Sequence, residues 1–186
     1  MTNAFDRSRL IELLKRDALR LGTFTLASGR TSHYYVDGRK VTLSAEGAAQ
    51  IGLGMLAALD DLPDLAAIGG LTMGADPIIG ATLFAAGLAG GNRANLRGFL
   101  VRKETKTHGT GRLVEGPLEE GSEVAILDDV ATTGGSSLQA VAAVKAMGCK
   151  VRRVVVVLDR LEGAAEAFAA EGLEFRALVT IKDLGV

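Results

Sequence analysis

Apolar residues in this chain alternate between two spacings, and the alternation predicts an α/β fold. An apolar stripe at helical spacing predicts an amphipathic helix over about residues 6–21, ended by Gly22. The same reasoning places later helices at about 44–59, 76–86, 137–147 and 163–170, and short apolar strands at 66–70, 99–101, 124–127, 154–158 and 175–181. Strands that alternate with helices indicate a mostly parallel sheet flanked by helices, with right-handed crossovers.

Two segments depart from this alternation. Residues 24–41 mix aromatic and β-branched positions around Ser28-Gly29-Arg30, which predicts a hairpin or a pair of short strands. Residues 103–117 are charged and dotted with glycine, so we expect a loop. We find no linker and no internal repeat, and the length of 186 residues favours one domain over 1–186.

Composition narrows the function classes without choosing one. The net charge of −1 offers no strong field for nucleic acid or an acidic membrane. Cys149 is the only cysteine, so no intrachain disulfide is possible, and we expect a packed thiol. The first residues show no signal-peptide pattern, and no apolar run approaches the roughly 20 residues of a membrane span. These features predict a soluble, cytoplasmic protein.

The segment from Val124 to Ser137 carries the clearest chemistry. An apolar run typical of a central parallel strand leads into Asp128 and Asp129, then into the turn Thr132-Thr133-Gly134-Gly135. Open α/β sheets bind ligands where strands end, and such a turn can aim backbone N–H groups at a phosphate. Ser136 or Ser137 can cap the following helix. Carboxylates beside a phosphate cradle suit a phosphorylated ribose, whereas the Walker A and G-x-G-x-x-G patterns are absent.

A basic run follows the strand at 99–101. Arg102, Lys103, Lys106 and His108 fall within seven residues, with Gly109 and Gly111 closing the run. Such a loop is either functional or a solvated surface loop, and its charges could close over a diphosphate. Composition alone leaves both interpretations open.

These blocks resemble type I phosphoribosyltransferases, which use 5-phosphoribosyl 1-diphosphate (PRPP). Val124–Ser137 resembles their PRPP motif, and R-K-x-x-K-x-H-G-x-G at 102–111 looks like the mobile loop of the orotate-specific branch. The resemblance implies that Lys106, Asp128 and Asp129 are catalytic. It further implies that PRPP is bound by Arg102, Lys103, Lys106, His108, Asp128, Asp129, Val130, Ala131, Thr132, Thr133, Gly134, Gly135 and Ser136.

Two further segments extend the resemblance to the base. Phe24–Asp37 is similar to the family's F-x-L-x-S-G-R-x-S-x-[FY]-[FY] segment, and Asp159-Arg160 is similar to its D-R pair. Orotate binding is thereby implied for Tyr34, Tyr35, Thr132 and Arg160. An arginine fork suits the carboxylate that orotate carries. Tyr34 and Tyr35 could instead be ordinary core or hairpin residues. Asp159 and Arg160 could instead be an ordinary surface pair at the end of a strand.

Taken whole, the resemblance implies a type I phosphoribosyltransferase-like fold with a small N-terminal hood over about 1–42 and a mobile loop over about 103–117. It implies transfer of a phosphoribosyl group from PRPP to orotate in pyrimidine biosynthesis. Mg²⁺ would be bound through PRPP and water, with no direct protein ligand. A homodimer would share the basic loop across subunits. Two alternatives stay open: a non-catalytic PRPP-sensing regulator of this fold, and a phosphoribosyltransferase for another nucleobase.

Overall fold

The computed structural model describes residues 4–25, 31–104 and 113–186. Its helices include α1 Arg7–Leu13, η1 Leu14–Ala18, α2 Arg39–Thr42, α3 Ala45–Ala57, α4 Asp76–Ala89, η2 Gly91–Asn95, α5 Gly135–Lys145, α6 Ala164–Ala170 and η3 Ile181–Leu184. Its strands include β1 Leu19–Thr25, β2 Thr31–Val36, β3 Ala67–Leu71, β4 Arg97–Val101, β5 Val114–Glu115, β6 Glu123–Ala131, β7 Lys150–Asp159 and β8 Phe175–Thr180.

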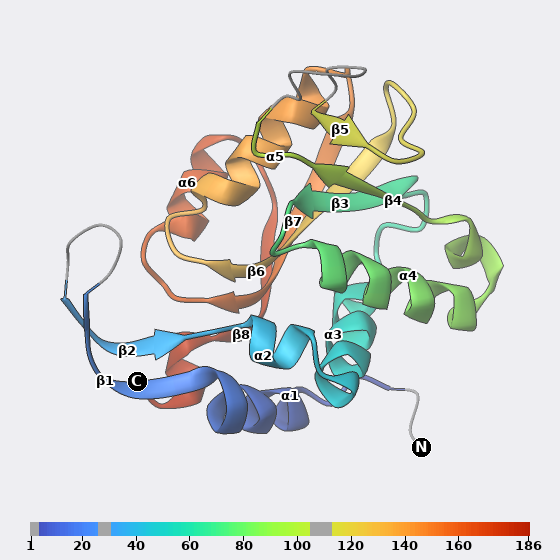
Figure 1. Ribbon diagram of the computed structural model, residues 1–186. Helices are drawn as coiled ribbons and strands as arrows, with labels where there is room; N and C mark the ends of the chain where they lie inside the picture. Colours follow the sequence, from blue (N-terminus) through green and yellow to red (C-terminus); the bar gives the residue numbers. More distant parts are fainter. Residues whose placement is uncertain (1–3, 26–30, 105–112) are drawn as a thin grey trace.

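A six-stranded sheet forms the centre of the molecule, in the order β5-β4-β3-β6-β7-β8 (Figure 1). Only the β4–β5 pair is antiparallel, so the predicted mostly parallel sheet is confirmed. β6 lies in the middle, and residues 124–128 are buried, as their apolar run predicts. Because β6 is central, the side chains at its carboxyl end lie between two neighbouring strands.

Apolar side chains fill both sides of this sheet. Residues of α1, α3 and α4 pack on one face, against Ile68, Ala125 and Val155 among others. Residues of α5 and α6 pack on the other, where Phe168 and Val141 are buried. Cys149 belongs to this second cluster and is buried, as expected. Because helices cover both faces of a parallel sheet, ligands bind at the carboxyl ends of its strands, called the carboxyl edge below.

The N-terminal region differs from its prediction in where the first helix ends. Helical structure stops at Ala18, not at about 21, and Leu19–Thr25 is a strand. Gly22, expected to end the helix, lies inside β1 at an irregularity between Leu21 and Phe24. The expected hairpin is present as the antiparallel pair β1–β2, a separate two-stranded sheet (Figure 1). Strand pairing with β2 overrode the helical spacing of Leu21.

Other boundaries also move, and two of these changes lie near the acid pair or the basic segment. Val114–Glu115 forms a short antiparallel strand beside β4, inside the segment expected to be a loop. β6 runs on to Ala131, so the acid pair lies within its last residues and not beyond its end. Within the described ranges, no helix is long and apolar enough to cross a bilayer.

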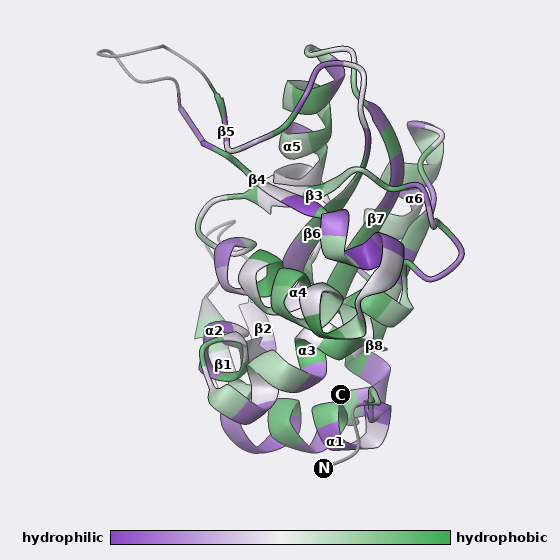
Figure 2. Cartoon of the chain, turned by 90° about the vertical axis from the view of Figure 1, so that its right-hand side faces the viewer, coloured by the Kyte–Doolittle hydropathy of each residue, from purple (hydrophilic) through white to green (hydrophobic). Residues whose placement is uncertain are grey.

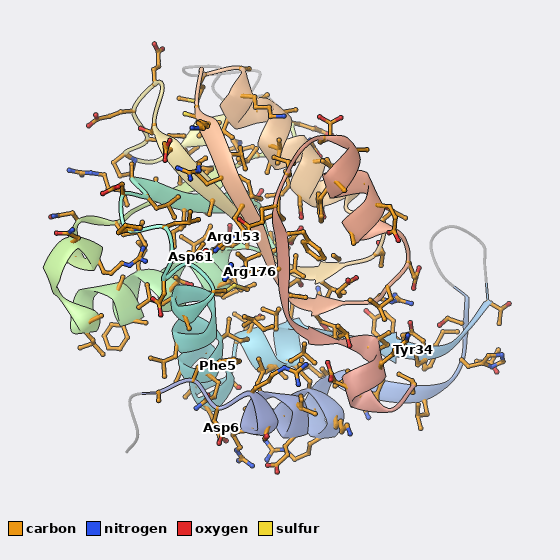
Figure 3. All side chains as sticks on the ribbon, turned by 180° about the vertical axis from the view of Figure 1, so that it is seen from behind. Phe5, Asp6, Tyr34, Asp61, Arg153 and Arg176 are labelled. Carbon is orange, nitrogen blue, oxygen red and sulfur yellow. The ribbon has the colours of Figure 1, made fainter. Side chains whose placement is uncertain are left out.

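An ion cluster lies at the opposite, amino edge of the sheet, and it consists of Asp61, Arg153, Glu174 and Arg176 (Figure 3). The Arg153 side chain is 1% exposed, and its guanidinium contacts Asp61 and Glu174 at 2.7 Å each. It also donates to the carbonyl of Ala58 at 2.6 Å. The cluster therefore ties the segment after α3 to β7 and β8.

Candidate active site

The acid pair is held in place by its own backbone and by two serines. Asp128 is 4% exposed, and its Oδ2 accepts hydrogen bonds of 2.8 Å from the hydroxyls of Ser136 and Ser137. The backbone N–H of Asp129 donates to Asp128 Oδ1 at 3.0 Å, and that of Val130 donates to Asp129 Oδ1 at 2.8 Å. Both carboxylates are thus fixed before any ligand arrives.

Two other segments approach the same carboxylates. A Cβ atom at Gly74 would lie 2.9 Å from Asp129 Oδ1 and 3.2 Å from Asp128 Oδ1, so only glycine fits there comfortably. Gly38, at the start of α2, lies close to Asp129 as well, since its Cβ would be 3.5 Å from Asp129 Oδ2. The turn after β3, the end of β6 and the start of α2 therefore meet at one point.

The electrostatic environment of Asp129 is unfavourable to its own charge. Burial, followed by the nearby charge of Asp128, raises the pKa of Asp129 to about 6. The carboxylate pair is thus under-compensated by the described residues. A ligand that donates hydrogen bonds or carries a cation would relieve this repulsion.

The turn after β6 leaves the start of α5 open. The residue before the helix is Gly134, with φ of 81° and no side-chain hydrogen bond to the helix N–H groups. A Cβ there would approach Phe168 to 2.9 Å, so both the backbone angle and the close approach require glycine. The expectation that Ser136 or Ser137 caps this helix is wrong, because both hydroxyls bind Asp128 instead. The unsatisfied N–H groups of the first turn are a site for an anion such as a phosphate.

Arg160 lies beside this turn and against Tyr34. Its backbone N–H donates to the carbonyl of Ala131 at 2.9 Å, and its guanidinium lies 4.9 Å from the centre of the Tyr34 ring. Tyr34 packs against the main core, whereas Tyr35 is 40% exposed and contacts Phe24. Of the two tyrosines, Tyr34 is the one that the fold brings to Arg160, with Thr132 adjacent in sequence to Ala131.

The stem of the basic segment also reaches this edge of the sheet. The backbone N–H of Arg102 donates to Leu113 O at 2.8 Å, and its side chain pairs with Glu115 at 3.7 Å. The carbonyl of Lys103 accepts a bond of 3.0 Å from Gln139 on α5. Lys106 and His108 lie outside the described residues. The described part of this segment, at Lys103, lies next to α5, the helix that follows the acid pair.

Sequence reasoning missed several residues here. The sequence suggests Ser137 only as a cap and gives no signal for Gly38. It suggests the turn Gly70–Gly74 as a source of backbone N–H groups for the diphosphate, but not as the space beside the acid pair. Glu162 was not considered, although it pairs with Arg160 at 2.8 Å. Only the folded backbone shows which small residues face a carboxylate.

Three features lie together at the carboxyl edge of this sheet: an acid pair, an open helix start and a paired arginine. Together they define a phosphoribosyltransferase of the type I class. No protein-family model matches the chain. Individual proteins do match the chain. The chain is 49% identical over 186 residues to an orotate phosphoribosyltransferase of Rhodopirellula baltica, and the alignment covers 97% of this chain and 95% of the relative. It is 48% identical to that of Thermosynechococcus vestitus, covering 96% and 92%.

Solved structures agree with these relatives. Orotate phosphoribosyltransferase of Mycobacterium tuberculosis in complex with Fe(III) dicitrate superposes with a TM-score of 0.85 at 43% identity, covering 97% of this chain and 99% of that one. The PRPP complex of the same enzyme gives 0.81 at 40% identity, covering 97% and 99%. The chain belongs to the orotate phosphoribosyltransferase family.

Proposed function

We propose that this protein joins orotate to PRPP, giving orotidine 5′-monophosphate and diphosphate, a step of pyrimidine biosynthesis. In this reaction a bond forms between N1 of orotate and C1′ of the ribose, the C1′–O bond to the diphosphate breaks, and the proton of orotate N1 is lost to the departing diphosphate or to water. The observation that carries the proposal is the meeting of three elements at one edge of the sheet: the acid pair, the uncapped start of α5, and Arg160 against Tyr34.

The acid pair is assigned to the ribose. Asp128 and Asp129 accept hydrogen bonds from the ribose hydroxyls, and their negative charge favours the positive character that C1′ gains as the diphosphate leaves. The segment Val130–Ser136, whose last residues form the uncapped start of α5, holds the 5′-phosphate. Preorganisation supports this assignment, because Ser136 and Ser137 already fix Asp128.

Mg²⁺ is the proposed cofactor, held by PRPP and by water rather than by a protein cluster. Across the described ranges no group of three or more metal-ligating side chains is found. Mg²⁺ commonly keeps several of its waters and takes ligands from substrate phosphates, which is the mode of binding proposed here. The under-compensated charge at Asp129 supports a cation nearby. When bound, Mg²⁺ would neutralise the charge of the diphosphate.

Arg102, Lys103, Lys106 and His108 are proposed to bind and neutralise the departing diphosphate. Lys106→Ala is expected to lower kcat by about 10²-fold, as when an electrostatic contact to a developing charge is lost. If only KM rose, the segment would bind PRPP without contributing to the chemical step.

In the site for the nucleobase, Arg160 is proposed to bind the carboxylate of orotate, with Tyr34 and Thr132 beside the pyrimidine ring. Arg160 Nε is buried without a hydrogen-bond partner among the described residues, which supports a ligand there. Tyr35 is a weaker candidate, because its exposed ring lies against Phe24.

A homodimer that shares the basic segment is also proposed. Its supporting feature is an apolar face at α3 and α4, where Leu43, Phe84 and Leu88 are each at least 66% exposed. Figure 2 shows hydrophobic residues along both helices. The three exposed residues border a groove of about 900 Å³. Exposed apolar surface of this kind suits a second copy of the chain. Analytical ultracentrifugation at assay concentration tests it, and a monomer would contradict it. A cytoplasmic location remains part of the proposal.

The direct test is a spectrophotometric assay of orotate consumption with PRPP and Mg²⁺. Uracil, adenine and hypoxanthine serve as controls for the base. Turnover of orotate alone is expected, since only orotate offers a carboxylate to Arg160. Binding of PRPP without turnover of any base would favour a PRPP-sensing regulator, and turnover of another base would favour a different phosphoribosyltransferase.

A further inference from the structure

The turn that carries Arg160 is fixed on both sides. Leu161 has a φ of 57°, a left-handed conformation that no other non-glycine residue in the described ranges adopts. Asp159 Oδ1 accepts the Leu161 N–H at 2.8 Å, and the Arg160 N–H is bound to Ala131. A strained conformation of this kind persists only where its surroundings hold it. The backbone therefore gives Arg160 one defined starting direction.

The guanidinium is then fixed by two contacts, and its Nε is left without a partner among the described residues. Its Nη2 lies 2.8 Å from Glu162 Oε1, and the side chains of Arg160 and Glu162 are 10% and 23% exposed. One face of the guanidinium lies over Tyr34 at 4.9 Å. The Nε atom is buried and has no hydrogen-bond partner among the described residues. A guanidinium that is held in place and has a buried donor without a partner can bind a ligand that accepts a hydrogen bond.

We propose that Glu162 is a positioning residue for the base subsite: it holds the guanidinium of Arg160 so that the unused Nε side meets the carboxylate of orotate. This inference rests on the proposed function, and it deepens the assignment of Arg160. Arginine is long and rotamer-rich, and without a partner its head would extend toward water. Glu162 removes that freedom before orotate binds, which lowers the entropic cost of binding.

The charge of Glu162 has an opposing effect, because it repels the carboxylate of orotate. Positioning is expected to dominate for a geometric reason. Glu162 is compensated by the guanidinium at 2.8 Å, so the pair is neutral overall when orotate approaches. The incoming carboxylate then meets the guanidinium directly and Glu162 from further away. The two effects have opposite signs in the KM for orotate, so one measurement separates them.

Glu162→Gln is the main variant, because it keeps the size of the side chain and removes its charge. Loss of one ordered side chain corresponds to a roughly 3- to 10-fold rise in the KM for orotate. We expect kcat within about twofold of the parent and the KM for PRPP unchanged. Glu166→Gln, four residues further along and exposed, is the matched control for the loss of a carboxylate and should change none of these values.

A double-variant cycle shows whether Glu162 acts through Arg160. The affinity for orotate is measured by calorimetry for Glu162→Gln, Arg160→Ala and the double variant. If Glu162 only positions Arg160, its replacement has no further effect once Arg160 is gone. Equal effects in both backgrounds would make Glu162 a structural residue and overturn the proposal. An unchanged or lower KM in Glu162→Gln would also overturn it. If the unmodified protein turns over no orotate, the proposed function fails instead.

Discussion

The two edges of the central sheet differ in how their charged side chains are paired. At the amino edge, Arg153 is buried between Asp61 and Glu174, and opposite charges meet at hydrogen-bond distance. At the carboxyl edge, Asp128 and Asp129 bring two like charges together, and Arg39, whose charge reaches Asp129, is itself paired with Asp37. The first arrangement lowers the pKa of Asp61, and the second raises the pKa of Asp129 to about 6.

This contrast separates stability from chemistry. The amino edge satisfies its charges within the protein, so removing a partner should cost stability and leave turnover intact. The carboxyl edge leaves charge and donors for a ligand, so it should cost stability in the free protein and supply activity. Enzymes commonly carry a destabilised site of this kind. Substitutions at the two edges test this separation.

Replacing both Asp128 and Asp129 by Asn should have the largest effect on activity. We expect turnover of orotate with PRPP to fall by about 10³-fold, since contacts that stabilise developing charge are lost. Circular dichroism should show an intact fold, because Asn is close to Asp in size. Activity within a few-fold of the parent would remove the acid pair from the mechanism.

Arg160→Ala should follow in size. Loss of a buried, charge-assisted contact is worth about 2–4 kcal/mol, so kcat/KM for orotate should fall by roughly 30- to 1,000-fold. Affinity for PRPP should change little, because the phosphate site is a different turn. Titration calorimetry with each substrate checks this. Equal losses for both substrates would show that Arg160 is structural.

At the amino edge, Arg153→Ala should destabilise the protein by about 2–3 kcal/mol, because two carboxylates lose their buried partner. Their partial exposure keeps the loss at the lower end of the usual range. Urea unfolding measures it, and kcat of the folded enzyme should stay within about twofold. A large loss of kcat with unchanged stability would break the separation of the two edges.

Stability should also depend on pH with opposite signs at the two edges. The lowered pKa of Asp61 means that its stabilisation is present above about pH 4 and is lost as the pH falls below that value. The raised pKa of Asp129 means that the folded state holds its proton longer, so stability decreases as the pH rises from about 4 to 6. Unfolding at pH 2–8 without ligands tests both. Asp61→Asn should flatten the acid limb and Asp129→Asn the limb between pH 4 and 6.

The order of helices and strands could be predicted from sequence because apolar spacing reports which side of an element is buried. The strand at 124–127 and the helix that begins near residue 44 were predicted correctly for this reason. The end of the first helix was not, because pairing of β1 with β2 is a contact between segments that spacing cannot report. The strand at 114–115 was missed because two residues carry too little pattern.

The candidate site divides in the same way. Asp128, Asp129 and Arg160 were identified from charged residues placed after apolar strands, and the fold brings them to one edge. Glu162 could not be found from sequence, and neither could the closeness of Gly74 to the acid pair. Glu162 reaches Arg160 only through the left-handed turn at Leu161, and Gly74 matters only because another strand approaches it.

The most direct test of the account compares Asp129→Asn with Asp61→Asn at pH 7, measuring both the free energy of unfolding and kcat/KM. Relief of burial and like-charge repulsion should make Asp129→Asn more stable than the parent, by about 1–2 kcal/mol, and strongly impaired in turnover. Asp61→Asn should be less stable and fully active. A destabilised or active Asp129→Asn, or an inactive Asp61→Asn, would contradict the assignment of chemistry to the carboxyl edge and stability to the amino edge.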